Sequence, residues 1–100
     1  MLSYLKQIKH LTNICLAMNL NLEYVSKNVL KDYIGMNSGA ATQMGFKMPK
    51  NTIYILRGLD DKIKLHTLLH EIIEYKLIKE RHFGYWKAHC IALRNEGLVI

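Results

Sequence analysis

The sequence is poor in the residues that mark disordered or low-complexity chains. Its 100 residues include one proline and six glycines, and half of them are apolar. This composition predicts one small globular domain covering residues 1–100, with enough apolar side chains for a single core.

Cysteine is equally scarce. Cys15 and Cys90 are too far apart in sequence to form a zinc-finger pair, and two cysteines do not make a disulfide framework. No apolar run approaches the length of a membrane-spanning helix, and charges interrupt the N-terminus too often for a signal peptide. We therefore expect a reduced, cytoplasmic protein that does not enter membranes.

Acidic residues are fewer than basic ones, eight against 14, and the net charge is +6. The lysines are scattered rather than clustered, which is more typical of solubility than of a nucleic-acid surface. A small basic nucleic-acid-binding regulator, in which the last two helices imitate a helix-turn-helix, is the least favoured interpretation. The last helix would begin with Tyr85, Trp86 and only Lys87, where a recognition helix normally exposes several Arg, Asn or Gln residues.

The order of apolar and turn residues predicts an α+β fold. Residues 2–18 carry apolar side chains at intervals of three and four, which predicts an N-terminal helix. Thr52–Leu56 is β-branched and aromatic, and it predicts a strand. We expect residues 43–48 to pair with it in a small antiparallel sheet, a hairpin over about 43–56, after a loop at residues 37–41.

Two further helices are expected in the C-terminal half. Asp60 is a natural N-cap for a helix over about 60–81. A last helix is expected over about 85–96, with Gly97 as its stop signal.

The helix expected over 60–81 has an unusual polar set. Between Lys64 and Lys76 its strongly polar side chains are His66, His70, Glu71 and Glu74. A solvated helix face would usually carry lysines, whereas these residues are the types that bind metals.

His70 and Glu74 are four residues apart, so one helical turn brings both side chains to the same place. The last helix offers His89 as a third ligand. Two histidines and one carboxylate leave a fourth position for water, which is the catalytic arrangement of zinc. The expected cofactor is therefore Zn2+, although cobalt, nickel and iron accept the same donors.

Glu71 follows His70 and lies off the ligand axis, where it could reach a metal-bound water. The metal would lower the pKa of this water toward about 7, and Glu71 would act as the general base. His66 and Tyr85 are candidates for the lining of the cleft, and Glu96 is a candidate hydrogen-bond partner of a ligand. Simple packing or solvent exposure stays the alternative for each of these three.

From about Gly45 to Glu96 the chain resembles the zincin metallopeptidases, in particular their small, minimal members. The resemblance rests on the expected hairpin, on Thr67-Leu68-Leu69-His70-Glu71 at the active helix, and on a downstream helix that carries a ligand. It implies a peptidase that binds an extended peptide or protein substrate as an added strand, beside Thr52–Leu56 or Gln43–Met48.

The chain departs from the usual zincin motif, His-Glu-x-x-His with a downstream carboxylate. Glu74 stands in the place of the second histidine, and His89 stands in the place of the downstream carboxylate. Two interpretations follow: a zinc-dependent peptidase of narrow specificity, or an interaction module that keeps the zincin fold and has lost hydrolysis.

Overall fold

The computed structural model describes residues 3–95, which form five α-helices and a three-stranded sheet. The predicted α+β class is confirmed, and so are the N-terminal helix, the strand Thr52–Leu56 and the two C-terminal helices. In chain order the elements are α1 (Tyr4–Ala17), β1 (Asn21–Val25), α2 (Lys27–Leu30), β2 (Gly35–Asn37), α3 (Ser38–Met44), β3 (Thr52–Leu56), α4 (Asp61–Arg81) and α5 (Tyr85–Asn95).

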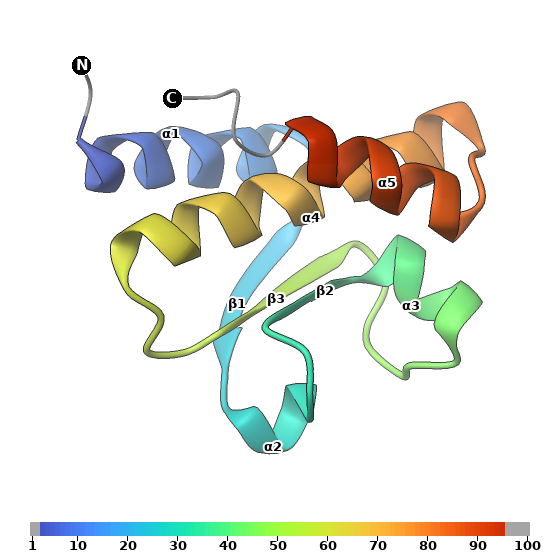
Figure 1. The fold of residues 1–100 in the computed structure, drawn as a ribbon, viewed down its shortest axis with the longest axis horizontal. Helices are drawn as coiled ribbons and strands as arrows, with labels where there is room; N and C mark the ends of the chain where they lie inside the picture. Colours follow the sequence, from blue (N-terminus) through green and yellow to red (C-terminus); the bar gives the residue numbers. More distant parts are fainter. Residues whose placement is uncertain (1–2, 96–100) are drawn as a thin grey trace.

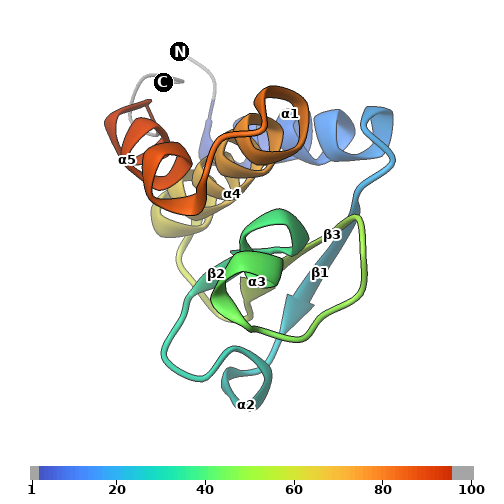
Figure 2. The same ribbon diagram turned by 90° about the vertical axis from the view of Figure 1, so that its right-hand side faces the viewer.

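The elements form a helical layer over a small sheet. Helices α1, α4 and α5 lie together on one side of the sheet, and α3 continues from the end of β2 toward α5 (Figure 1). The view turned by 90° shows the same two layers, with the helices above the sheet (Figure 2). α4 contacts α1, α3, α5, β2 and β3, so it is the element around which the others pack.

The sheet has the order β1-β3-β2. β3 pairs in parallel with β1 and antiparallel with β2, with Gly35 opposite Ile55 and Asn37 opposite Ile53. The predicted hairpin partner was therefore wrong. The antiparallel partner of β3 is Gly35–Asn37, not residues 43–48.

The reason lies in the segment that was expected to be a loop at residues 37–41. The Asn37 side chain accepts a hydrogen bond from the backbone N–H of Ala40 at 2.9 Å, which caps a helix that begins at Ser38. Gly45 ends this helix in the left-handed conformation, with φ at 73°. Ala40 and Ala41 are buried, because their small side chains let α3 pack closely.

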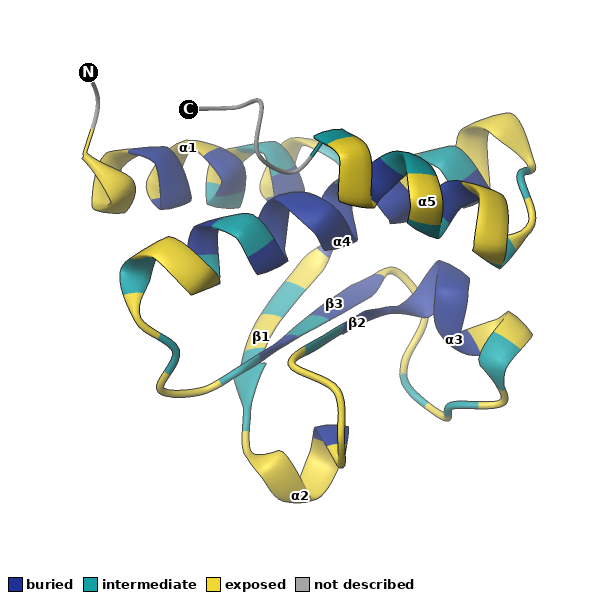
Figure 3. Cartoon of the chain, in the orientation of Figure 1, coloured by how far each residue is buried: buried dark blue, intermediate teal, exposed yellow. Residues whose placement is uncertain are grey.

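The core lies on both sides of α4 (Figure 3). On one side, apolar residues of α1, β3 and α4 form a cluster that includes Leu11, Ile53 and Leu68. On the other side, Met36, Ala40 and Ala88 belong to a second cluster. The middle of α4 is consequently buried almost all round, although it carries ionisable residues.

Among residues 3–95, no helix is both long enough and apolar enough to cross a bilayer. Glu96, the stop signal Gly97 and the apolar residues 98–100 lie outside the described residues.

Candidate metal centre

Three ionisable residues occupy the buried middle of α4. His70, Glu71 and Glu74 are 8%, 6% and 2% exposed. Buried ionisable groups are costly unless they are paired, so their partners decide what this part of the helix can do.

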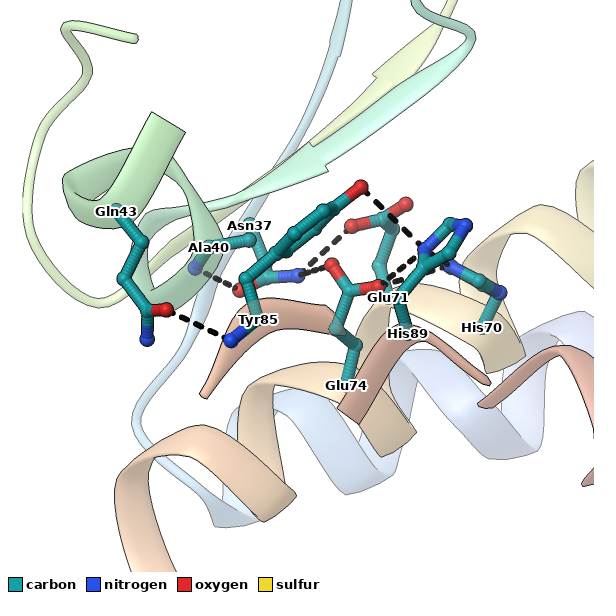
Figure 4. Close-up of polar contacts among 8 residues, drawn as sticks. All are labelled: Asn37, Ala40, Gln43, His70, Glu71, Glu74, Tyr85 and His89. Atoms are coloured by element: carbon teal, nitrogen blue, oxygen red, sulfur yellow. Dashed lines mark hydrogen bonds and ion pairs between the residues drawn. The ribbon is translucent and has the colours of Figure 1, made fainter. Parts of the chain in front are cut away.

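His70 and Glu74 face each other across one helical turn, as their spacing predicts. His70 Nε2 lies 3.0 Å from Glu74 Oε2. The third residue comes from α5: His89 Nδ1 lies 2.8 Å from the same Glu74 oxygen and 3.2 Å from His70 Nε2 (Figure 4).

The approach of α5 depends on small side chains. Ala88 and Ala92 are completely buried, and they flank His89 on the inner surface of α5. The packing of α5 on α4 thus brings the His70–Glu74 pair and His89 together in one cluster.

The three atoms have the spacing of a metal ligand set. Four donors at the usual zinc bond lengths lie roughly 3.3 Å from one another in a tetrahedral site. The separations of 2.8, 3.0 and 3.2 Å are only slightly shorter. Because each of the three atoms lies close to the other two, one cation could bind all three at once. His70, Glu74 and His89 therefore lie close enough to bind a metal ion.

The electrostatics of Glu74 suit this role. Burial by itself would raise the pKa of Glu74, but the hydrogen bonds and charges of His70 and His89 lower it below its ordinary value. Glu74 is therefore ionised at neutral pH, as a carboxylate ligand must be.

The other oxygen of Glu74 is held by a residue that sequence reasoning missed. Asn37 Nδ2 donates to Glu74 Oε1 at 3.0 Å and to Glu71 Oε1 at 2.8 Å. Asn37 was assigned to a loop by composition. A signal was present, because an Asn before Ser-Gly-Ala-Ala is a good helix N-cap, but nothing local points this side chain at α4.

The cluster borders a cavity of about 480 Å³. Apolar side chains of several elements line the cavity together with His70, Glu71, Glu74 and His89. These apolar residues are Ile34, Met36, Met44, Ile63 and Leu93.

Tyr85 also lines this cavity. Its ring stacks on the ring of His89, with 5.2 Å between the centroids, and its hydroxyl lies 3.4 Å from His89 Nδ1. Burial and the negative charges of Glu74 and Glu71 raise the pKa of Tyr85 to about 12. The phenol is therefore protonated at neutral pH and can donate a hydrogen bond into the cavity.

His66 lies one turn before His70 and also lines the cavity. Within residues 3–95, the group close enough to share a metal consists of His70, Glu74 and His89, so His66 is not part of it. Glu96, the other candidate neighbour of the ligands, is outside the described residues.

The strand beside the cavity is β2, and not a strand of the predicted hairpin. Thr52–Leu56 is the central strand, so it cannot accept an added strand, and residues 43–48 do not belong to the sheet. Ile34, Gly35 and Met36 line the cavity instead. Among the strands that the structure describes, β2 is the edge strand on this side.

No family model matches this chain, and no match was found among curated proteins or solved structures. The resemblance to zincins therefore stays a prediction. The structure itself shows a buried cluster of two histidines and one carboxylate that could bind a metal ion, beside a largely apolar cavity.

Proposed function

We propose that this protein is a zinc-dependent hydrolase that cleaves an extended peptide or protein substrate. The convergence of His70 Nε2, Glu74 Oε2 and His89 Nδ1, with no pair more than 3.2 Å apart, is the observation that carries the proposal. Two imidazoles and one carboxylate are one of the ligand sets of catalytic zinc, which keeps its fourth position for water or substrate.

A zinc ion bound by these residues would lower the pKa of a water and polarise the substrate carbonyl. Glu71 supplies the base, because it follows His70, lines the same cavity and is only 6% exposed. It takes the proton of the attacking water and passes it to the leaving amine. The Tyr85 hydroxyl, which stays protonated, donates a hydrogen bond to the negative charge that develops on the carbonyl oxygen.

The apolar lining of the cavity supports a peptide with an apolar side chain as the substrate. Ile34, Ile63 and Leu93 line it and are each more than 40% exposed, so they form an accessible apolar rim beside the ligands. β2 is an edge strand at the same place, and an extended peptide can pair with the free edge of a sheet through its backbone.

An interaction module without hydrolysis is the second candidate. Trp86, at the start of α5, is 73% exposed and lies beside Tyr85. Exposed aromatic residues near an apolar cavity favour a protein partner. A binding module would use the same cavity without needing Glu71 as a base.

Zinc content and turnover of matched variants test the proposal. We expect purified protein made with zinc to contain the metal by elemental analysis, and His70→Ala to lose it. Glu71→Gln should retain zinc and lose cleavage of fluorogenic peptides that present Leu or Phe. Metal-free wild-type protein would overturn the proposal, and cleavage that survives Glu71→Gln would overturn the role of the base.

A further inference from the structure

Asn37 connects the sheet to both carboxylates of α4. It is the last residue of β2, and none of its surface is exposed. Its side chain makes three hydrogen bonds: it accepts from the Ala40 N–H and donates to Glu71 and Glu74 (Figure 4).

The direction of this amide is determined by its surroundings. The Ala40 N–H is a donor, so the oxygen of Asn37 must face it at 2.9 Å. The NH2 group then faces the two carboxylates, and each of its two hydrogens has one acceptor. Aspartate or serine could cap α3 in the same way, but neither offers a pair of donors in this position.

The two hydrogen bonds constrain the carboxylates differently. Asn37 holds Glu74 Oε1 at 3.0 Å, which leaves Glu74 Oε2 pointing at the two histidines. Glu74 is thereby presented as a ligand through one oxygen.

Glu71 is held by Asn37 through one oxygen and has room beside Gly35 for the other. Asn37 Nδ2 lies 2.8 Å from Glu71 Oε1, and a Cβ atom at position 35 would lie 3.0 Å from Glu71 Oε2. Gly35 therefore leaves the room that this carboxylate occupies. β2 thus contributes two features to the site: the amide donor of Asn37 and the space beside Gly35.

We propose that Asn37 is a positioning residue for the metal centre, which sets the orientation of the ligand Glu74 and the base Glu71 together. This inference rests on the proposed function, because it assigns a role toward a bound metal. Groups that hydrogen-bond to metal ligands typically change metal affinity or activity by roughly 10- to 100-fold when they are replaced.

Two substitutions separate this role from the helix cap. Asn37→Asp keeps the shape and the cap but replaces the donors with a third carboxylate. Asn37→Ser keeps a capping oxygen and adds no charge. Ser3→Ala is the matched control, because Ser3 caps α1 through the Lys6 N–H and is not among the residues that line the cavity.

Zinc affinity, measured by competition with a chromogenic chelator, is the readout and does not require peptidase activity. We expect Asn37→Ser to bind zinc roughly 10- to 100-fold more weakly than wild type, and Asn37→Asp to bind it more weakly as well. Cobalt in place of zinc should give a changed visible absorption spectrum in Asn37→Ser and an unchanged one in Ser3→Ala. A purely structural role of Asn37 would not produce this spectral difference.

The outcomes separate this inference from the proposed function. Wild-type protein that binds no zinc overturns both. Wild-type protein that binds zinc, with Asn37→Ser of equal affinity and equal cobalt spectrum, overturns the inference alone. If Asn37→Asp does not fold, as judged by circular dichroism, Asn37→Ser still decides the result.

Discussion

Both sides of α4 pack against apolar clusters, but the side toward α5 and β2 also carries buried ionisable residues. Toward α1 and β3 the helix presents Leu65, Leu68 and Ile72, which pack in an apolar cluster. Toward α5 and β2 it presents His70 and Glu74, which are held by hydrogen bonds. One helix therefore joins an apolar seam, the α1–α4–β3 contact, to a polar one, the α4–α5–β2 contact.

Apolar packing of the kind found in the apolar seam is sufficient to stabilise this fold. The buried ionisable residues of the polar seam are not needed for that purpose. Replacing buried ion pairs with apolar residues of similar volume is often neutral or stabilising, by about 1–4 kcal/mol. The polar seam is thus poorly explained by stability. Its ligand geometry and its place on a cavity support the proposed metal chemistry instead.

The largest expected effect comes from a cavity in the apolar seam. Leu68 is completely buried, so Leu68→Ala should lower the free energy of unfolding by about 2–5 kcal/mol, measured by urea denaturation. The zinc affinity of the folded protein should not change. Leu93→Ala, at a position that is 52% exposed, should have little effect on stability. Equal losses in the two variants would contradict the assignment of Leu68 to the buried apolar core.

In the polar seam the next effect should be on catalysis alone. Tyr85→Phe removes the hydroxyl that lies 3.4 Å from His89, and kcat should fall roughly 100- to 1,000-fold, equivalent to about 3–4 kcal/mol. Zinc content should be unchanged. Tyr33 also lines the cavity, and Tyr33→Phe should retain full activity. Full turnover in Tyr85→Phe would remove Tyr85 from the mechanism, and an equal loss in Tyr33→Phe would show that the effect is not specific to the Tyr85 hydroxyl.

Zinc binding at the polar seam should stabilise the folded protein, and the size of this gain should not depend on the apolar seam. Zinc at 100 times its dissociation constant should raise the free energy of unfolding by about 2.7 kcal/mol. His89→Ala should abolish this gain, and Leu68→Ala should preserve it above its own lower baseline. Calorimetry with and without chelator measures each increment. A gain that survives His89→Ala would place the zinc elsewhere.

The smallest effect concerns pH and Cys15 in the apolar seam. Burial raises the pKa of the Cys15 thiol from 9.0 to about 11. The unfolded chain therefore loses this proton first, so the stabilising contribution is complete below pH 9 and is lost as the pH rises toward 11. At pH 10 the loss is about 1.4 kcal/mol.

Cys15→Ala supplies the control for this pH dependence. The difference between the unfolding free energies of wild type and Cys15→Ala at each pH should isolate the contribution of Cys15. The other groups that titrate in this range are present in both proteins, so their contributions cancel. A flat difference between pH 8 and pH 11 would contradict the assignment. Cys90 is exposed, so it should react with a thiol reagent while folded Cys15 does not.

Predictions from the sequence succeeded where the pattern is local. The periodic apolar residues of α1, the cap at Asp60 and the β-branched run Thr52–Leu56 depend on neighbours within a few positions, and each became the expected element. The juxtaposition of His70 and Glu74 follows in the same way from one helical turn.

Strand pairing was mispredicted because it is not local. Residues 43–48 and 35–37 are both short, and no feature within either segment reveals which one pairs with β3. The Asn37 cap, the small residues of α3 and the left-handed Gly45 decide the matter by turning 38–44 into a helix.

The candidate site also has a part that depends on local sequence and a part that depends on contacts between distant segments. The residue types and the spacing on α4 are written in the chain, because helical geometry relates positions four apart. The contacts of Glu74 with His89 and Asn37 span 15 and 37 residues, and they exist only because α5 and β2 pack against the same helix. The ligand types are thus legible in the sequence, whereas the third donor and the amide that orients both carboxylates depend on tertiary packing.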